Sequence, residues 1–154
     1  MANPSQNRNI ILITGASSGI GKACATHLTH EGHHVYGTSR RQRPPNALFT
    51  MLQMDVRQDD EVAAGVQEIL SREGHLDVVI NNAGFGYSGA VEDTSVEEAR
   101  AMFETNVFGA LRVCRAVLPT MRAQGHGTII NIGSIGGIIG RPYQGLDTAT
   151  NLAV

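Results

Sequence analysis

The sequence predicts an α/β fold, a doubly wound parallel sheet with helices on both of its faces. Three observations lead to this fold class. Short apolar runs rich in β-branched residues alternate along the chain with segments whose apolar residues recur at helical spacing. The first of these runs is continuously apolar, as expected of a strand buried on both faces. The intervals between runs are short, and each parallel connection needs a crossover, so the alternation favours a parallel sheet.

The first half of the chain supplies three of the five predicted strands. Residues 10–14 form the continuously apolar run, which stops at a glycine. A helical pattern follows and ends at Gly32, a residue type that suits the C′ position. Residues 33–39 and 48–54 predict the second and third strands, and the proline-containing stretch 40–46 between them predicts a loop. The apolar positions of the first helix are Ile20, Cys24 and Leu28.

The next helix and strand continue the alternation. Either Asp59 or Asp60 is predicted to cap the second helix, since a carboxylate accepts hydrogen bonds from the first helical turn. Apolar residues at helical spacing continue to Gly74, where we expect the helix to end. Residues 76–80 then predict the fourth strand.

The last part of the chain predicts a long helix and a fifth strand. Ser95 with Glu98 three residues later forms a capping box that opens the helix. Residues 128–132 predict the fifth strand, and residues 147–154 resemble the first two turns of another helix. Because the chain stops there, we expect a single domain over residues 1–154 that is incomplete at its carboxyl end. The apolar stripe predicted for the long helix is Ala99, Phe103, Val107, Leu111, Cys114 and Leu118.

Composition excludes several classes of function. The 154 residues include 12 Lys and Arg against 14 Asp and Glu, a net charge of −2. Such a balance gives no overall field to attract nucleic acid or acidic lipid headgroups, so we expect no nucleic-acid partner. No apolar run approaches the roughly 18 residues needed to span a bilayer, which predicts no membrane segment and a cytoplasmic protein. His27 and His30 are three residues apart, but no cysteine or acidic cluster completes a ligand set, so no metal site is predicted.

A glycine-rich turn between the first strand and the first helix is the strongest local signal. Residues 14–21 read TGASSGIG. Such a turn lets backbone N–H groups approach a phosphate, and the helix N-terminus adds a partial positive charge. The glycine spacing differs from GxGxxG, so spacing alone leaves open a turn built only for tight packing. The predicted phosphate-proximal residues are Gly15, Ser17, Ser18, Gly19, Ile20 and Gly21.

Further polar signals follow the other predicted strands. Ser39, Asp55, Asn82 and Ser134 each lie just beyond the carboxyl end of a different strand. Those ends share one edge of a parallel sheet, and ligands of open α/β sheets bind in the crevice at that edge. The sequence therefore predicts one ligand site there.

The turn TGASSGIG, followed by NNAG at residues 81–84, resembles the short-chain dehydrogenase/reductase family. The resemblance implies a Rossmann-like sheet of about five strands in the order 3-2-1-4-5. It also implies hydride transfer between a nicotinamide and a ketone or secondary alcohol. The cofactor contacts that it adds are Asp55, Val56, Asn82, Ala83 and Gly84. It implies that Ser134 polarises the carbonyl oxygen of a small-molecule substrate and that Asn106 supports an ordered water.

The end of the second strand indicates which nicotinamide cofactor is preferred. Folds that use NAD place a carboxylate there to bond the ribose 2′-hydroxyl. This chain instead has Ser39, followed by Arg40, Arg41 and Arg43. A guanidinium can hold a 2′-phosphate in a bidentate manner, so NADP(H) is preferred over NAD(H). A solvated basic loop without a ligand is the alternative.

The family's proton-transfer pair is missing. The family's pattern would put a tyrosine where Asp147 stands and a lysine where Asn151 stands. Lys22 is the only lysine and lies in the first helix, while Tyr143 lies four residues early in a predicted loop. An aspartate can accept a proton but does not readily donate one for ketone reduction. We therefore expect cofactor binding to exceed turnover.

Two hypotheses about the function remain open. One is an NADP(H)-dependent short-chain oxidoreductase with impaired activity. The other is a non-catalytic NADP(H)-binding module or a fragment of a degenerate paralogue. The fifth strand is expected to form an open edge of the sheet, which favours self-association into a homo-oligomer.

Overall fold

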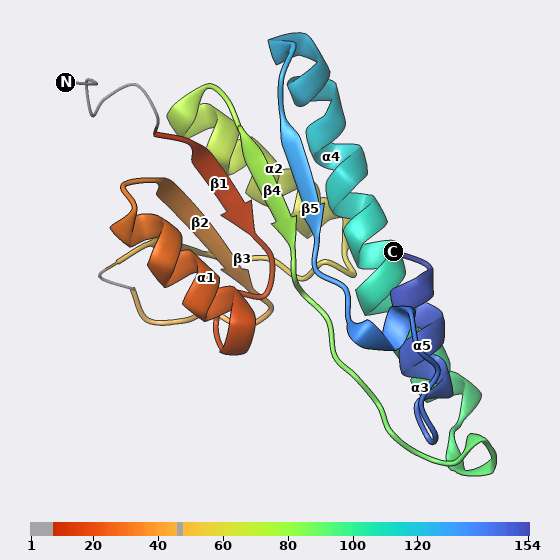
Figure 1. Cartoon of the computed structure of the whole chain (residues 1–154). Coiled ribbons are helices and arrows are strands. Elements are labelled where there is room, and N and C mark those ends of the chain that lie inside the picture. Colours follow the sequence, from red (N-terminus) through yellow and green to blue (C-terminus); the bar gives the residue numbers. More distant parts are fainter. Residues whose placement is uncertain (1–7, 46–47) are drawn as a thin grey trace.

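The parallel sheet is the centre of the computed structural model, which describes residues 8–45 and 48–154. Its strands follow the order β3-β2-β1-β4-β5, and every neighbouring pair is parallel (Figure 1). This order and the flanking helices confirm the predicted fold class. The strands are β1 (Ile10–Ile13), β2 (His34–Ser39), β3 (Thr50–Gln53), β4 (Val78–Asn81) and β5 (Thr128–Asn131).

The helices alternate with the strands along the chain. Three short or irregular helical segments accompany them: η1 (Val91–Asp93), the π-helical segment η2 (Glu104–Phe108) and η3 (Ile135–Gly137). The loop predicted at residues 40–46 follows β2 over residues 40–45. Residue 46 lies outside the described residues. The α-helices are α1 (Gly19–His30), α2 (Asp59–Glu73), α3 (Val96–Phe103), α4 (Gly109–Gln124) and α5 (Gly145–Leu152).

Two apolar cores lie on opposite faces of the sheet. Successive side chains of a strand point to opposite faces, so Ile10 and Leu12 join one core while Ile11 and Ile13 join the other. The first core packs against α2 and α4, and the second packs against Ala25 of α1. Burying both faces of β1 explains why its sequence is apolar without alternation.

The helix boundaries follow the sequence signals with one correction. The capping box of Ser95 and Glu98 is formed at the start of α3. Gly74 adopts a left-handed φ of 77° at the end of α2, as a terminating glycine should. The predicted cap of α2 was wrong. Gln58 is the N-cap, and Asp59 and Asp60 lie in the first turn, where their charges still favour the helix N-terminus.

The face that α1 turns to the sheet also differs from the prediction. Ile20 is 69% exposed, whereas the buried residues are Gly21 and Ala25. Cys24 and Leu28 are only partly buried against the core. The first helical turn lies beyond the end of the sheet, so Ile20 has no strand to pack against and faces the crevice described below.

The long helix contains an irregularity that the sequence pattern did not predict. A π-helical segment, η2, joins α3 to α4. The predicted apolar stripe was wrong, since Leu111 is 52% exposed. A Cβ on Gly109 would lie 2.7 Å from Cγ2 of Val56, so this glycine lets the helix approach the sheet with a different face. The buried positions are Met102, Thr105, Gly109, Val113, Val117 and Met121.

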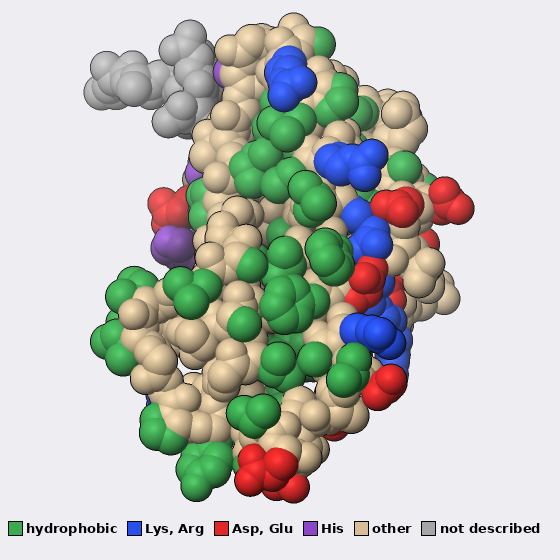
Figure 2. All heavy atoms as spheres, turned by 90° about the vertical axis from the view of Figure 1, so that its right-hand side faces the viewer, with side chains coloured by type: hydrophobic (Ala, Val, Ile, Leu, Met, Phe, Trp, Pro, Cys, Tyr) green, Lys and Arg blue, Asp and Glu red, His purple; other side chains and the backbone are tan. Residues whose placement is uncertain are grey.

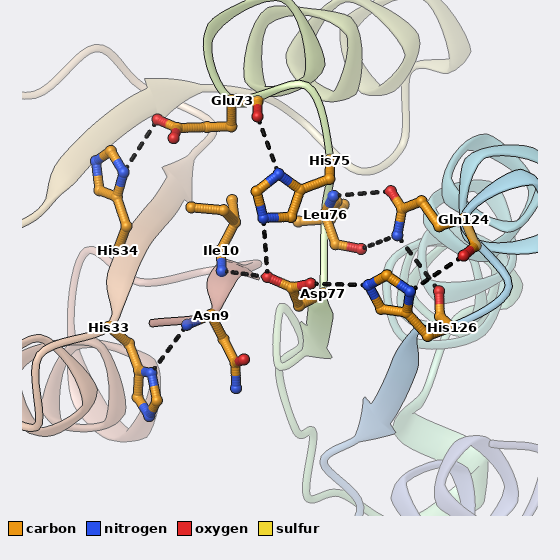
Figure 3. A network of polar contacts seen from close by, with 10 residues as sticks. All are labelled: Asn9, Ile10, His33, His34, Glu73, His75, Leu76, Asp77, Gln124 and His126. Atoms are coloured by element: carbon orange, nitrogen blue, oxygen red, sulfur yellow. Dashed lines mark hydrogen bonds and ion pairs between the residues drawn. The ribbon is translucent and has the colours of Figure 1, made fainter. Parts of the chain in front are cut away.

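Polar side chains form a network of hydrogen bonds and ion pairs at the amino-terminal end of the sheet (Figure 3). The Asp77 carboxylate accepts a hydrogen bond from the backbone N–H of Ile10 at 2.7 Å. His75 and His126 approach the same carboxylate with Nε2 at 3.4 and 3.2 Å. Nearby, Glu73 meets Nδ1 of His34 at 3.0 Å. These contacts join β1, β4 and the turn before β5.

The edge of the sheet that β5 forms is open, as predicted. Within the described ranges β5 pairs with β4 alone, and Ile130 and Ile132 are exposed. Figure 2 shows hydrophobic side chains spread over the side of the molecule that lies to the right in Figure 1. Leu111 of α4 and Leu152 of α5 are exposed. In the part of the chain that the structure describes, every helix is too short or too polar to cross a membrane.

Candidate functional site

The turn between β1 and α1 needs glycine at three positions for two reasons. Gly15 and Gly19 have φ of +69° and +56°, in the left-handed region that L side chains rarely adopt. Gly21 is required by space, because a Cβ there would lie 2.4 Å from Nδ2 of Asn82 and 2.6 Å from O of Gly15. The turn is therefore packed tightly against the segment that follows β4.

Thr14 and Asn82 fix the turn to that segment. The buried Thr14 hydroxyl accepts hydrogen bonds from the backbone N–H groups of Asn82 and Ala83, both at 2.9 Å. In return, Nδ2 of Asn82 donates to O of Thr14 at 2.9 Å and to O of Gly15 at 3.2 Å. The two sequence motifs thus form one hydrogen-bonded unit. Thr14 was absent from the predicted site residues, although it opens the TGASSGIG motif.

Three arginines follow β2 at the same edge of the sheet. Arg40, Arg41 and Arg43 line the crevice beside the glycine turn and are exposed. Over residues 8–45 and 48–154, no salt bridge joins any of them to a carboxylate. Ser39 is buried, and its Oγ accepts from the backbone N–H of Arg41 at 3.4 Å. The cluster therefore presents positive charge that described carboxylates do not pair.

Asp55 and Val56 take different positions at this end. Val56 lines the crevice, whereas the Asp55 side chain lies beside it and is held by Arg57. The guanidinium donates to Oδ1 at 3.0 Å and to Oδ2 at 2.6 Å. These hydrogen bonds from Arg57 hold the pKa of the Asp55 carboxyl below its ordinary value, although its burial acts in the opposite direction. Asp55, which was predicted to contact the cofactor, thus forms an ion pair with Arg57 in this structure.

Asn106 lies in the π-helical segment and ties two other elements together. Its Oδ1 accepts from the backbone N–H of Phe85 at 3.1 Å, and its Nδ2 donates to O of Phe85 at 3.0 Å. The same Nδ2 reaches Oγ1 of Thr150 in α5 at 3.2 Å. Phe85 follows the NNAG motif, so Asn106 holds that loop and α5 in place. The side-chain amide has little capacity left for a ligand.

Ser134 and Asp147 both line the crevice. Ser134 precedes η3, and its Oγ accepts from the backbone N–H of Gly136 at 3.2 Å. A Cβ on Gly136 would lie 3.1 Å from Oδ2 of Asp147 and 3.6 Å from Oγ of Ser134, so both oxygens border the same point. On the other side, a Cβ on Gly86 would lie 3.1 Å from Oδ1 of Asp147. Glycines on both sides thus make room for this carboxylate.

Within residues 8–45 and 48–154, no Lys, Arg or His forms a salt bridge with the Asp147 carboxylate. Nδ2 of Asn151 donates to the backbone oxygen of Asp147 at 2.9 Å and not to its carboxylate. Lys22 lines a separate depression on α1 with His27 and His30. Tyr143 precedes α5, is 70% exposed and does not line the crevice. Neither Lys22 nor Tyr143 therefore lines the crevice.

One crevice of about 820 Å³ joins the two ends of the site. Its volume falls in the range of about 300–1,000 Å³ typical of ligand pockets. Of the predicted residues, Gly21 and Asp55 do not line it. Thr14, Thr38, Phe85 and Thr150 line it without having been predicted as site residues, and Arg43 of the predicted arginine cluster lines it as well. The predicted residues that line it are Gly15, Ser17, Ser18, Gly19, Ile20, Ser39, Arg40, Arg41, Val56, Asn82, Ala83, Gly84, Asn106 and Ser134.

A glycine turn that feeds a helix N-terminus at the carboxyl edge of a doubly wound sheet defines a nucleotide-binding α/β protein. The short chain dehydrogenase family model matches residues 9–154. The chain therefore belongs to the short-chain dehydrogenase/reductase family.

Individual relatives support the same assignment. The chain is 50% identical over 145 residues to 3-ketodihydrosphingosine reductase of Bacteroides thetaiotaomicron, covering 94% of this chain and 54% of that protein. It is 34% identical over 164 residues to human 17-beta-hydroxysteroid dehydrogenase type 1, covering 96% of this chain and 49% of that protein. The chain thus spans about half the length of the curated relatives that it matches.

Solved structures have the same fold. A short-chain dehydrogenase from Streptomyces avermitilis superposes with a TM-score of 0.89 at 36% identity, over 97% of this chain and 57% of that one. ElxO with NADP bound superposes with a TM-score of 0.90 at 32% identity, over 96% of this chain and 64% of that one.

Proposed function

We propose that this chain binds NADP(H) in the crevice and transfers hydride to a ketone, or from a secondary alcohol, only weakly. The unpaired arginine cluster after β2 carries the cofactor preference. A carboxylate at this position would repel a 2′-phosphate, and here Ser39 stands in its place. The NADP held by ElxO, a structure of TM-score 0.90, supports the same choice.

The residues fit the parts of this cofactor. Gly19 and the N-terminal turn of α1 would hold the diphosphate, because a Cβ on Gly19 would meet open space and the helix end offers free N–H groups. Arg40 and Arg41 would hold the 2′-phosphate. When bound, the nicotinamide supplies or takes up the hydride.

Proton transfer is the step that this chain supports poorly. Ser134 Oγ accepts a hydrogen bond from Gly136, which leaves its O–H free to donate to a carbonyl oxygen of a small-molecule substrate. Reduction also needs an acid to protonate that oxygen, and the Asp147 carboxylate accepts protons instead. Loss of general acid catalysis costs about 100- to 10,000-fold in rate.

Asp147 and Asn151, which stand where the family has tyrosine and lysine, favour the second candidate function, a non-catalytic NADP(H)-binding module. Turnover separates the two candidates. Steady NADPH oxidation with small ketones that disappears in Ser134→Ala would establish a weak oxidoreductase. Nucleotide binding without such turnover would establish the binding module. Asp147→Tyr combined with Asn151→Lys is expected to raise turnover at least about 100-fold if the rest of the site is competent.

The first test is a thermal titration with NADPH and NADH. Ligand that binds only the folded state raises the melting temperature, so NADPH should give the larger shift. Arg40→Ala should reduce that shift, whereas Arg100→Ala, an exposed arginine on α3, should leave it unchanged. Equal shifts with both nucleotides would contradict the NADP(H) preference. The absence of any shift would contradict the binding function.

A further inference from the structure

Charge is distributed unevenly along the crevice. Among its described lining residues, the charged side chains are Arg40, Arg41 and Arg43 at one end and Asp147 at the other. The Asp147 carboxylate takes part in no hydrogen bond or salt bridge within the described ranges. Its negative charge is therefore available to a ligand.

The proposed cofactor would place its nicotinamide near that charge. If the arginine cluster holds the 2′-phosphate and the α1 N-terminus holds the diphosphate, the adenosine half is fixed at one end. The rest of the molecule must then follow the crevice past Asn82 and Gly84 toward Ser134 and Asp147.

The two redox forms of the cofactor differ in charge at this position. The oxidised nicotinamide ring carries one positive charge and the reduced ring is neutral, while the remainder of the molecule is the same. A neighbouring carboxylate attracts the oxidised ring and gives the neutral ring no comparable attraction. The family's tyrosine and lysine would give this end of the crevice a net positive charge, and Asp147 with Asn151 makes it negative.

We propose that Asp147 makes the crevice select the oxidised form of NADP(H) over the reduced form. This inference rests on the proposed function and adds a preference for redox state to it. Asp147 acts here as a specificity-determining residue for the cofactor, independently of whether any substrate is turned over. The chain would then hold NADP⁺ in preference to NADPH at equal concentrations.

The test measures Kd for NADP⁺ and for NADPH by calorimetry, in the unaltered chain and in Asp147→Asn. The substitution keeps the size of the side chain and removes its charge, so every other charge in the protein stays constant. The ratio of Kd for NADPH to Kd for NADP⁺ should fall about tenfold, chiefly because NADP⁺ binds more weakly. Asp60→Asn, an exposed acid in α2, should leave the ratio unchanged.

The outcomes separate this inference from the proposed function. Binding of both forms with the same ratio in Asp147→Asn as in the unaltered chain would overturn the inference alone. Binding of neither form by the unaltered chain would overturn the proposed function together with it. The inference is supported if the ratio of Kd for NADPH to Kd for NADP⁺ falls in Asp147→Asn. Raising the salt concentration should lower the ratio of the unaltered chain toward the same value. NADPH binding by Asp147→Asn also reports that the variant is folded.

Discussion

Two carboxylates at opposite ends of the sheet, Asp77 and Asp147, differ in the partners that the protein gives them. At the amino-terminal end, the Asp77 carboxylate is surrounded by the backbone N–H of Ile10 and by two histidines (Figure 3). At the carboxyl-terminal end, Arg40 and Asp147 line the crevice without a salt bridge to a described residue. Polar groups that the protein itself satisfies stabilise the fold, whereas those left unsatisfied are available to a ligand.

The two histidines show how complete the amino-terminal network is. His75 places Nδ1 2.9 Å from O of Glu73 and Nε2 against Asp77. His126 places Nδ1 3.2 Å from O of Gln124 and Nε2 against the same carboxylate. Each ring thus contacts both the Asp77 carboxylate and a backbone oxygen.

The largest expected effect comes from disturbing the packing of the glycine turn. Gly21→Ala should lower the free energy of unfolding by about 3 kcal/mol, because the new Cβ would overlap with Asn82 and with the backbone of Gly15. Urea unfolding measures the loss. Gly145→Ala is the matched control, since a Cβ there meets nothing within 4 Å. Similar stability of the two variants would show that the turn is not tightly packed.

The next effect tests whether the amino-terminal network stabilises the fold without touching the ligand site. Asp77→Ala removes the acceptor of the Ile10 N–H and should cost about 2 kcal/mol of unfolding free energy. Its affinity for NADPH at the other end of the sheet should stay unchanged, as calorimetry can measure. Asp93→Ala, an exposed acid in η1, should change neither quantity. A loss of NADPH affinity in Asp77→Ala would show that the two ends are coupled.

Alkaline pH should expose the contribution of Tyr36, which lies in the same network. Burial, helped by the hydrogen bond to Glu73, raises the pKa of Tyr36 to about 12. Since the folded-state pKa lies above the unfolded value near 10, the contribution is fully present below about pH 10 and is lost as pH rises through 12. At pH 11 the loss should be about 1 kcal/mol. Urea unfolding of Tyr36→Phe should lack this alkaline decline, and an equal decline in both proteins would contradict the assignment.

The smallest effect belongs to the histidines, which are partly exposed. Replacing both His75 and His126 with alanine should lower the free energy of unfolding by about 0.5–1 kcal/mol. The reason is that the contacts of both rings with the Asp77 carboxylate are lost. Urea unfolding measures the difference. His30→Ala on α1 is the control, and an equal cost in the control would contradict a stabilising role of the two rings.

The fold could be predicted from the sequence to within a few residues at each element, because strand and helix periodicities are local properties. The prediction failed where distant residues decide the outcome. The face of α4 is selected by the close approach of Gly109 to Val56, and no periodicity encodes that contact. The cap of α2 failed for a smaller reason, since three polar residues in succession could each begin the helix.

The candidate site shows the same division. The glycine turn is one short run of sequence and the arginine cluster is another, so each could be recognised by itself. The structure brings both to one crevice. The hydrogen bonds of Thr14 join segments 68 and 69 residues apart, so its part in the site could not be predicted from spacing. Asn106 was predicted through the family resemblance, but its bond to Thr150 depends on how α5 packs.

The open position of β5 implies a gradient of local stability across the sheet. β1 is hydrogen-bonded on both sides, by β2 and by β4, whereas β5 pairs with β4 alone among the described strands. Backbone amides of Ile11 and Leu12 should therefore exchange with deuterium only when the whole sheet opens. The amide of Thr128, which donates to O of Asp77, should exchange through openings that detach β5 alone. Exchange at the β5 edge would then precede exchange in β1.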